Sequence, residues 1–231
     1  MSYVFSPAPV ASVPVLGTPE RFPVHRIYCV GRNYEDHAKE MGFTGREPPF
    51  FFLKPANSLI VVNAGETGTM PYPSLTSNLH HEIELVVAIG IGGKNITAAD
   101  AHKHIYGYAV GLDMTRRDLQ NEMKKQGRPW CIGKAFDHSA PIGPITPAEQ
   151  AGDIGNADIS LQVNAQERQH SQVSKLIWNI AETIEHLSAA WELQPGDLIF
   201  TGTPAGVAAV VAGDTMTGTV TGLTPLNITV K

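Results

Sequence analysis

Residues 79–89 read Leu79-His80-His81-Glu82-Ile83-Glu84-Leu85-Val86-Val87-Ala88-Ile89, with two acids at the head of an apolar run. Such a run predicts a buried β-strand, in which residues i and i+2 point to the same face. Glu82 and Glu84 would then direct their carboxylates to one point beside the core. Like charges held that close need a proton, a basic partner or a metal ion between them.

A third acid has a similar setting, because Asp113 ends the second apolar run, residues 108–112. Three carboxylates at two strand ends form an all-oxygen ligand set that suits Mg²⁺ or Mn²⁺. They would leave about three of roughly six octahedral positions open to water or substrate. Two alternatives stay open: the acids are exposed rim residues, or His80 joins Glu82 and Glu84 to hold Fe²⁺ or Zn²⁺.

The bulk composition excludes several classes of protein. The chain has 231 residues, 42% of them hydrophobic, and a net charge of −5, so no basic field attracts nucleic acid. No apolar run approaches the ~20 residues that cross a membrane. Two cysteines favour a reducing compartment, and residues 1–24 lack the basic start of a secretory signal. We expect a cytoplasmic protein with no nucleic-acid or membrane partner.

The order of predicted elements favours an α+β, mostly-β domain with a few helices. Short buried strands are expected at residues 27–30, 50–53 and 197–200, and hairpins from 207 to 231. Thr115 and Asp118 match a capping box that would begin a helix ending near Gln126, and the apolar stripe over residues 177–191 predicts a second helix. Residues 1–24, interrupted by prolines, are predicted to be an extended arm on a single catalytic domain, residues 25–231.

Other side chains could act beside the carboxylates. His37 and Glu40 are three apart on a predicted helix, so the acid could orient the imidazole as a general base, or both could be solvated surface groups. Lys134 and Lys54 follow buried-looking segments, where a cation could stabilise an oxyanion or simply face water. Arg117 could bind a substrate carboxylate or pair with a surface acid.

The glycine-rich loop at residues 201–206 could bind an anion through its amides and the Thr203 hydroxyl, or be an ordinary turn at the end of a strand. There is no Gly-x-Ser-x-Gly elbow, and neither cysteine has an obvious histidine partner. Water or enolate chemistry on a metal is therefore favoured over a covalent nucleophile.

From about Arg26 onward the chain resembles the fumarylacetoacetate hydrolase family. The matching segments, in the family's order, are residues 28–34 with His37 and Glu40, then residues 52–55, 80–85, 111–118, 133–137 and 196–204. The resemblance implies a mixed β-sandwich roll that assembles as a homodimer. It implies Mg²⁺ or Mn²⁺ on Glu82, Glu84 and Asp113, and a catalytic set of His37, Glu40 and Lys134. It also implies a substrate pocket lined by Arg32, Lys54, Arg117, Gln120 and Thr203.

The expected activity is hydrolysis of a carbon–carbon bond in an acylpyruvate, with 3-fumarylpyruvate as the best single substrate and aromatic degradation through gentisate as its setting. His37, oriented by Glu40 on a closing lid, would activate the attacking water. A nearer alternative uses the same metal site for decarboxylation or isomerisation of a related keto diacid, such as oxaloacetate or a homoprotocatechuate-pathway intermediate. A more distant one is a protein that binds metal or carboxylates without turnover.

Overall fold

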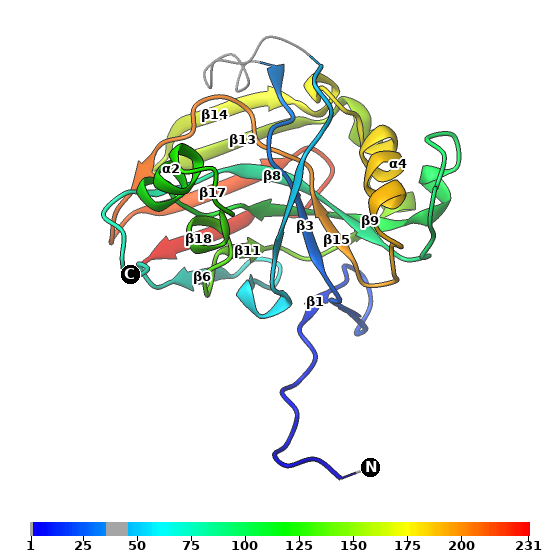
Figure 1. Ribbon diagram of the computed structural model, residues 1–231, viewed down its shortest axis with the longest axis horizontal. Helices are drawn as coiled ribbons and strands as arrows, with labels where there is room; N and C mark the ends of the chain where they lie inside the picture. The colour runs from blue at the N-terminus through cyan, green and yellow to red at the C-terminus, as the bar shows by residue number, and fades with distance from the viewer. Residues whose placement is uncertain (1, 36–45) are drawn as a thin grey trace.

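Two β-sheets packed against each other make up most of the protein, which a computed structural model describes for residues 2–35 and 46–231 (Figure 1). The larger sheet runs in the order β4 (Phe51–Lys54), β3 (Ile27–Val30), β15 (Leu198–Phe200), β8 (Ile83–Ile89), β9 (Ile105–Leu112), β11 (Ala140–Ile142), β5 (Leu59–Val61), with β12 (Thr146–Pro147) also paired to β9. The second sheet runs β14 (Gln166–Gln172), β13 (Asp158–Val163), β17 (Thr215–Val220), β18 (Leu226–Val230), β6 (Thr67–Met70). The prediction of a mostly-β fold is confirmed.

Two smaller sheets and three helices complete the described part of the fold. A three-stranded sheet joins β10 (Thr115–Arg116), β7 (Leu79–His80) and β16 (Ala209–Val210), and a hairpin pairs β1 (Ser12–Pro14) with β2 (Arg21–Pro23). Three α-helices lie within the described residues: α2 (Arg117–Lys125), α3 (Cys131–Lys134) and α4 (Ile180–Ala190).

Strand β8 lies at the centre of the fold and is buried along its whole length. Ile83 and Leu85 pack in the core between the two sheets, whereas Val86 and Ala88 pack on the opposite face beside Phe200. A strand covered on both faces reads as a continuous apolar run, which is why residues 85–89 carry no polar side chain. The same alternation directs the acids at its start to one face.

The two predicted helices form, but the start of the first was predicted wrongly. Thr115 lies in β10, and its hydroxyl donates to the Asp113 carbonyl rather than capping a helix. The Asp118 carboxylate instead accepts hydrogen bonds from the Thr76 hydroxyl and the Ser77 N–H, which tie α2 to the preceding loop. Helix α4 has the real capping box, between Asn179 and Glu182.

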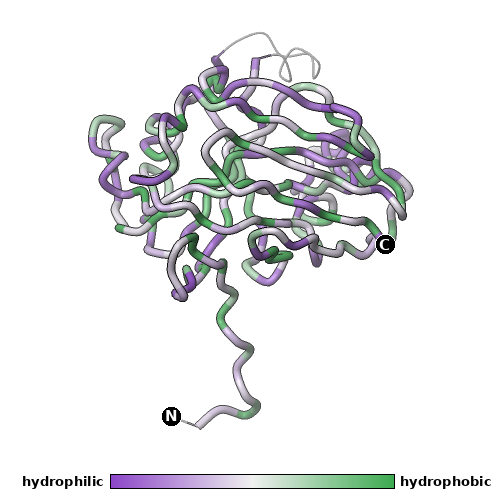
Figure 2. Tube along the Cα trace, turned by 180° about the vertical axis from the view of Figure 1, so that it is seen from behind, coloured by the Kyte–Doolittle hydropathy of each residue, from purple (hydrophilic) through white to green (hydrophobic). Residues whose placement is uncertain are grey.

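The N-terminal segment has two parts. Residues 2–10 are exposed and extend away from the body, as Figures 1 and 2 both show. The β1–β2 hairpin, in contrast, buries Val13, Val15 and Phe22 against the core of the larger sheet. The division of the chain at residue 24 stays a prediction.

None of the helices in the described part of the chain has the length and apolar character needed to cross a membrane.

Candidate metal centre and active site

The register of β8 on β9 brings the three predicted acids together. Ile83 pairs with Leu112, so Glu82 and Asp113 are the next residues along each strand, and the Asp113 N–H donates to the Glu82 carbonyl at 2.9 Å. Glu84 lies opposite Gly111, two residues before Asp113. Because the side-chain period of a strand is two, all three carboxylates emerge on one face at the same end of the strand pair.

These carboxylates form a compact buried cluster. One oxygen from each of Glu82, Glu84 and Asp113 can be chosen so that all lie within 4.8 Å of one another. Glu82 is 5% exposed, and the other two are 1% exposed. The alternative that they are exposed rim residues is therefore wrong.

Three basic side chains converge on the cluster. Lys134, from α3, places Nζ 2.6 Å from both Glu82 Oε2 and Asp113 Oδ2. Lys54, at the end of β4, places Nζ 2.8 Å from Asp113 Oδ1, and Arg117 pairs with Glu82. Burial lowers the pKa of Lys134, but the Asp113 and Glu82 carboxylates outweigh burial and leave that pKa raised, so the ammonium stays charged at neutral pH.

The carboxylate oxygens of Glu84 and Asp113 are suited to binding a divalent cation. Burial, with the charges of Asp113 and Glu82, holds the pKa of Glu84 well above its usual range, and its one hydrogen bond among the described residues comes from the Gly202 N–H at 2.8 Å. Asp113 Oδ1 is buried and is paired with the Lys54 ammonium at 2.8 Å, but no hydrogen bond to it is found among the described residues. Three buried carboxylates repel one another, and a hard divalent cation such as Mg²⁺ or Mn²⁺, which prefers oxygen ligands, offsets that repulsion.

The alternative metal set with His80 finds no support. His80 belongs to β7 rather than β8, and its ring nitrogens lie 2.8 Å from Asn78 Oδ1 and 3.3 Å from Arg117 Nε. Burial and the Arg117 charge lower the pKa of His80 to about 4, so the ring is neutral near pH 7. The metal-ligating cluster among the described residues contains carboxylates alone.

The glycine-rich loop contacts a carboxyl group of the protein itself, and its binding of a ligand anion stays a prediction. Its Gly202 amide donates to Glu84, while the Thr201 hydroxyl and N–H both donate to the Leu85 carbonyl. Gly202 has φ +103°, and a Cβ there would lie 2.7 Å from the Cβ of Asn33, so the loop needs glycine at this position.

One buried residue at the site was missed by sequence reasoning. Gln169, on β14, accepts hydrogen bonds at Oε1 from His81 Nδ1 (2.9 Å) and the Ile83 N–H (3.1 Å). Its Nε2 donates to Thr203 Oγ1 (2.9 Å) and the Pro204 carbonyl (2.8 Å). All four polar positions of this amide are used, so it joins the second sheet to the segment that carries Glu82 and Glu84 and to the loop whose Gly202 amide contacts Glu84. An isolated glutamine in a polar strand gives no sequence signal for this role.

The other predicted site residues divide into two groups. Arg117 Nη1 donates to Gln120 Oε1 at 2.5 Å, and Arg32 pairs with Glu47, which leaves these side chains with partners inside the protein. His37 and Glu40 lie outside the described residues, as does most of the predicted lid, so their roles stay predictions from the sequence.

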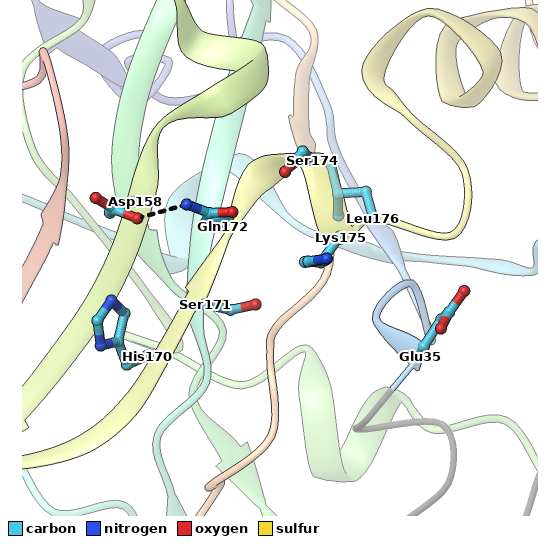
Figure 3. Close-up of a pocket in the computed structure, with 8 residues that line it drawn as sticks. All are labelled: Glu35, Asp158, His170, Ser171, Gln172, Ser174, Lys175 and Leu176. Carbon is cyan, nitrogen blue, oxygen red and sulfur yellow. Dashed lines mark hydrogen bonds between the residues drawn. The ribbon is translucent and has the colours of Figure 1, made fainter.

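A large hollow lies away from the carboxylates. Its volume is about 810 Å³, and its lining, shown in Figure 3, includes Asp158, His170, Gln172, Lys175 and Glu35. The side chains are of mixed charge, and Asp158 accepts a hydrogen bond from Gln172 at 3.2 Å. None of its lining residues belongs to the carboxylate cluster or its basic partners, so size alone does not identify the site.

The fold and the carboxylate centre define the class of protein. Residues 26–231 match the family described as fumarylacetoacetate (FAA) hydrolase C-terminal, and the chain belongs to this family.

Among its relatives, a fumarylpyruvate hydrolase from Ralstonia sp. is 48% identical over 184 residues, which cover 80% of this chain and 93% of the relative. The oxaloacetate tautomerase YcgM of Escherichia coli is 41% identical, covering 87% and 90%. A crystal structure of fumarylpyruvate hydrolase from Pseudomonas aeruginosa in complex with Mn²⁺ and pyruvate is 56% identical, with a TM-score of 0.97 over 99% of both chains.

Proposed function

We propose that this protein is a metal-dependent fumarylpyruvate hydrolase. It adds water across a carbon–carbon bond of 3-fumarylpyruvate, so that the acyl carbon leaves as the fumarate carboxylate and the methylene carbon takes a proton to become the methyl group of pyruvate. The buried cluster of Glu82, Glu84 and Asp113 carries the proposal, and the two fumarylpyruvate hydrolases at 48% and 56% identity support the choice of substrate.

Glu82, Glu84 and Asp113 would hold the cation, which we take to be Mg²⁺ or Mn²⁺; the related Pseudomonas structure contains Mn²⁺ and pyruvate. When bound, such a cation supplies Lewis-acid polarisation of the keto acid. The Gly202 amide fixes the orientation of Glu84, and the Lys134 and Arg117 cations fix both oxygens of Glu82.

We assign Lys134 to stabilising the negative charge that develops on the departing pyruvate. The electron pair of the broken bond moves onto the keto oxygen of the departing pyruvate, and a buried ammonium beside the three acids is placed to neutralise that charge. Removing one such preorganised donor typically lowers turnover by about 10²–10³-fold.

We assign proton transfer from the attacking water to His37, oriented by Glu40, on the sequence pattern alone. Arg32, Arg117, Gln120, Lys54 and Thr203 are assigned to substrate binding and to positioning the acids. A homodimer in the cytoplasm remains part of the proposal.

The test is hydrolysis followed by absorbance, with fumarylpyruvate, acetylpyruvate and oxaloacetate compared in Mg²⁺ or Mn²⁺ and in excess EDTA. We expect the protein to consume fumarylpyruvate, and EDTA to stop this activity. Glu82→Ala should have no activity. His37→Ala should also have no activity but should still bind oxalate. The Escherichia coli relative makes oxaloacetate tautomerisation the second candidate. Turnover of oxaloacetate alone would move the function to that activity, or to decarboxylation, on the same metal centre.

A further inference from the structure

A second hollow, of about 490 Å³, opens directly beside the carboxylate cluster. Its lining includes Phe50 and Phe52 of the β4 segment and Pro129 and Trp130 of the loop between α2 and α3. Lys134 belongs to both places: Nζ lies 2.6 Å from Glu82 and Asp113 and 5.1 Å from the centre of the Phe52 ring. The hollow therefore adjoins the proposed reaction centre through Lys134.

The walls of this hollow are flat and apolar. The Trp130 ring lies 5.3 Å from Phe50, edge to face at 87°, and 6.0 Å from Phe52. Phe50 remains 38% exposed and the neighbouring Leu53 41% exposed. Aromatic walls that stay accessible next to a polar centre suit a planar, unsaturated chain.

One cation at this hollow has no side-chain partner among the described residues. The three basic groups at the cluster, Lys134, Lys54 and Arg117, are held by its carboxylates. Arg128 lines the hollow and is exposed, and within the described parts of the chain its guanidinium makes no ion pair or hydrogen bond. Only its backbone N–H is engaged, by the Met123 carbonyl at the end of α2. The side chain is therefore available to an anionic ligand.

We propose that this hollow is the acyl subsite, in which Phe52 and Trp130 hold the unsaturated chain and Arg128 binds a carboxylate at its far end. The proposal rests on the proposed function and deepens it: the substrates are acylpyruvates whose acyl chain itself ends in a carboxylate. The charge arrangement favours this ligand over a second copy of the chain, because a carboxylate satisfies Arg128 while the keto-acid end reaches Lys134.

The experiment compares kcat/KM for fumarylpyruvate with that for acetylpyruvate, which lacks the distal carboxylate. We expect Arg128→Ala to lower the ratio of the two values about tenfold, mainly through KM, as an exposed charge-assisted contact would. Arg128→Lys should recover part of that loss. Lys125→Ala, which removes an exposed cation at the end of α2, three residues before Arg128 and outside the hollow, is the matched control and should leave the ratio within twofold.

A ratio in Arg128→Ala within twofold of wild type would overturn the subsite. A change in the molar mass of Trp130→Ala, measured by light scattering, would also overturn the subsite, because the hollow would then be an interface between copies of the chain. If wild type does not hydrolyse fumarylpyruvate, the proposed function fails separately. The subsite is then tested by inhibition of the turnover of whichever keto acid the protein does accept. Fumarate should inhibit that turnover better than crotonate, and Arg128→Ala should remove the preference. Equal inhibition in wild type would overturn it.

Discussion

The backbone N–H of Gly202 donates a 2.8 Å hydrogen bond to Glu84 Oε2, across two strands of the larger sheet. This contact connects the loop after β15 to the acid of the proposed metal set that has no cationic side chain in contact with it among the described residues. The loop therefore acts on the metal site by orienting a ligand.

Gly202→Ala should weaken metal binding by about tenfold or more. A Cβ would lie 2.7 Å from Asn33, at a φ of +103° that non-glycine residues rarely adopt, so the amide must move away from Glu84. Calorimetric titration with Mn²⁺ measures the effect. Gly213→Ala is the matched control, because Gly213 has φ +97° with no atom within 4 Å of the added Cβ. Equal loss of affinity in both variants would show that backbone strain alone is responsible.

Glu84→Gln should abolish the metal-induced rise in Tm while leaving the metal-free protein as stable as wild type or more so. The pKa of Glu84 is raised by burial and by Asp113 and Glu82, so a neutral amide of the same shape relieves the metal-free site. In wild type, metal at about 100 times Kd should raise Tm by about 5–10 °C. Thermal unfolding with and without Mn²⁺ measures both effects, with exposed Glu167→Gln as control. A normal metal-induced rise in Glu84→Gln would contradict the ligand assignment.

Gln169→Leu should lower the free energy of unfolding by about 2–4 kcal/mol. Four polar groups, on His81, Ile83, Thr203 and Pro204, would lose their partner in a buried region. Urea denaturation measures the change. Gln166→Leu, at an exposed position on the same strand, should change stability by less than about 0.5 kcal/mol. If Gln169→Leu lowers the free energy of unfolding no more than Gln166→Leu does, then water takes the place of the amide in these hydrogen bonds.

Glu182→Gln should make stability less dependent on acidification. The Arg46 side chain, with the Asn179 N–H, lowers the folded-state pKa of Glu182 below 4.5. A depressed carboxyl pKa contributes stability that is present above the unfolded value of about 4.5 and is lost as pH falls through the folded value. Because Glu182 is only partly buried and its Arg46 partner is exposed, solvent screens the pair, and we expect a difference below about 1 kcal/mol at pH 7 that vanishes at low pH. Urea titrations from pH 7 to 3 check this, with exposed Glu149→Gln as control. A difference that stays constant with pH would exclude this titration as its cause.

Several features were predictable from local pattern. The period-two placement of Glu82 and Glu84 before an apolar run indicated both the central strand and the shared face of the acids, and the position of Asp113 indicated the third ligand. The helix start at Thr115 was not predictable in the same way. A capping box is a local motif, and here long-range contacts from Thr76 and Ser77 took up the Asp118 carboxylate that the motif required.

The sheet-rich architecture and the three acids of the proposed metal set follow from the sequence alone, because strand periodicity and the cost of burying charge act between residues close in the chain. The partners of these acids come together only in the folded chain: Lys134 from α3, Lys54 from the edge strand and the Gly202 amide, with the Gln169 amide on the neighbouring His81. These groups lie 21 to 118 residues from the acids and histidine they contact, and such pairings arise from the register of strands rather than from any local preference.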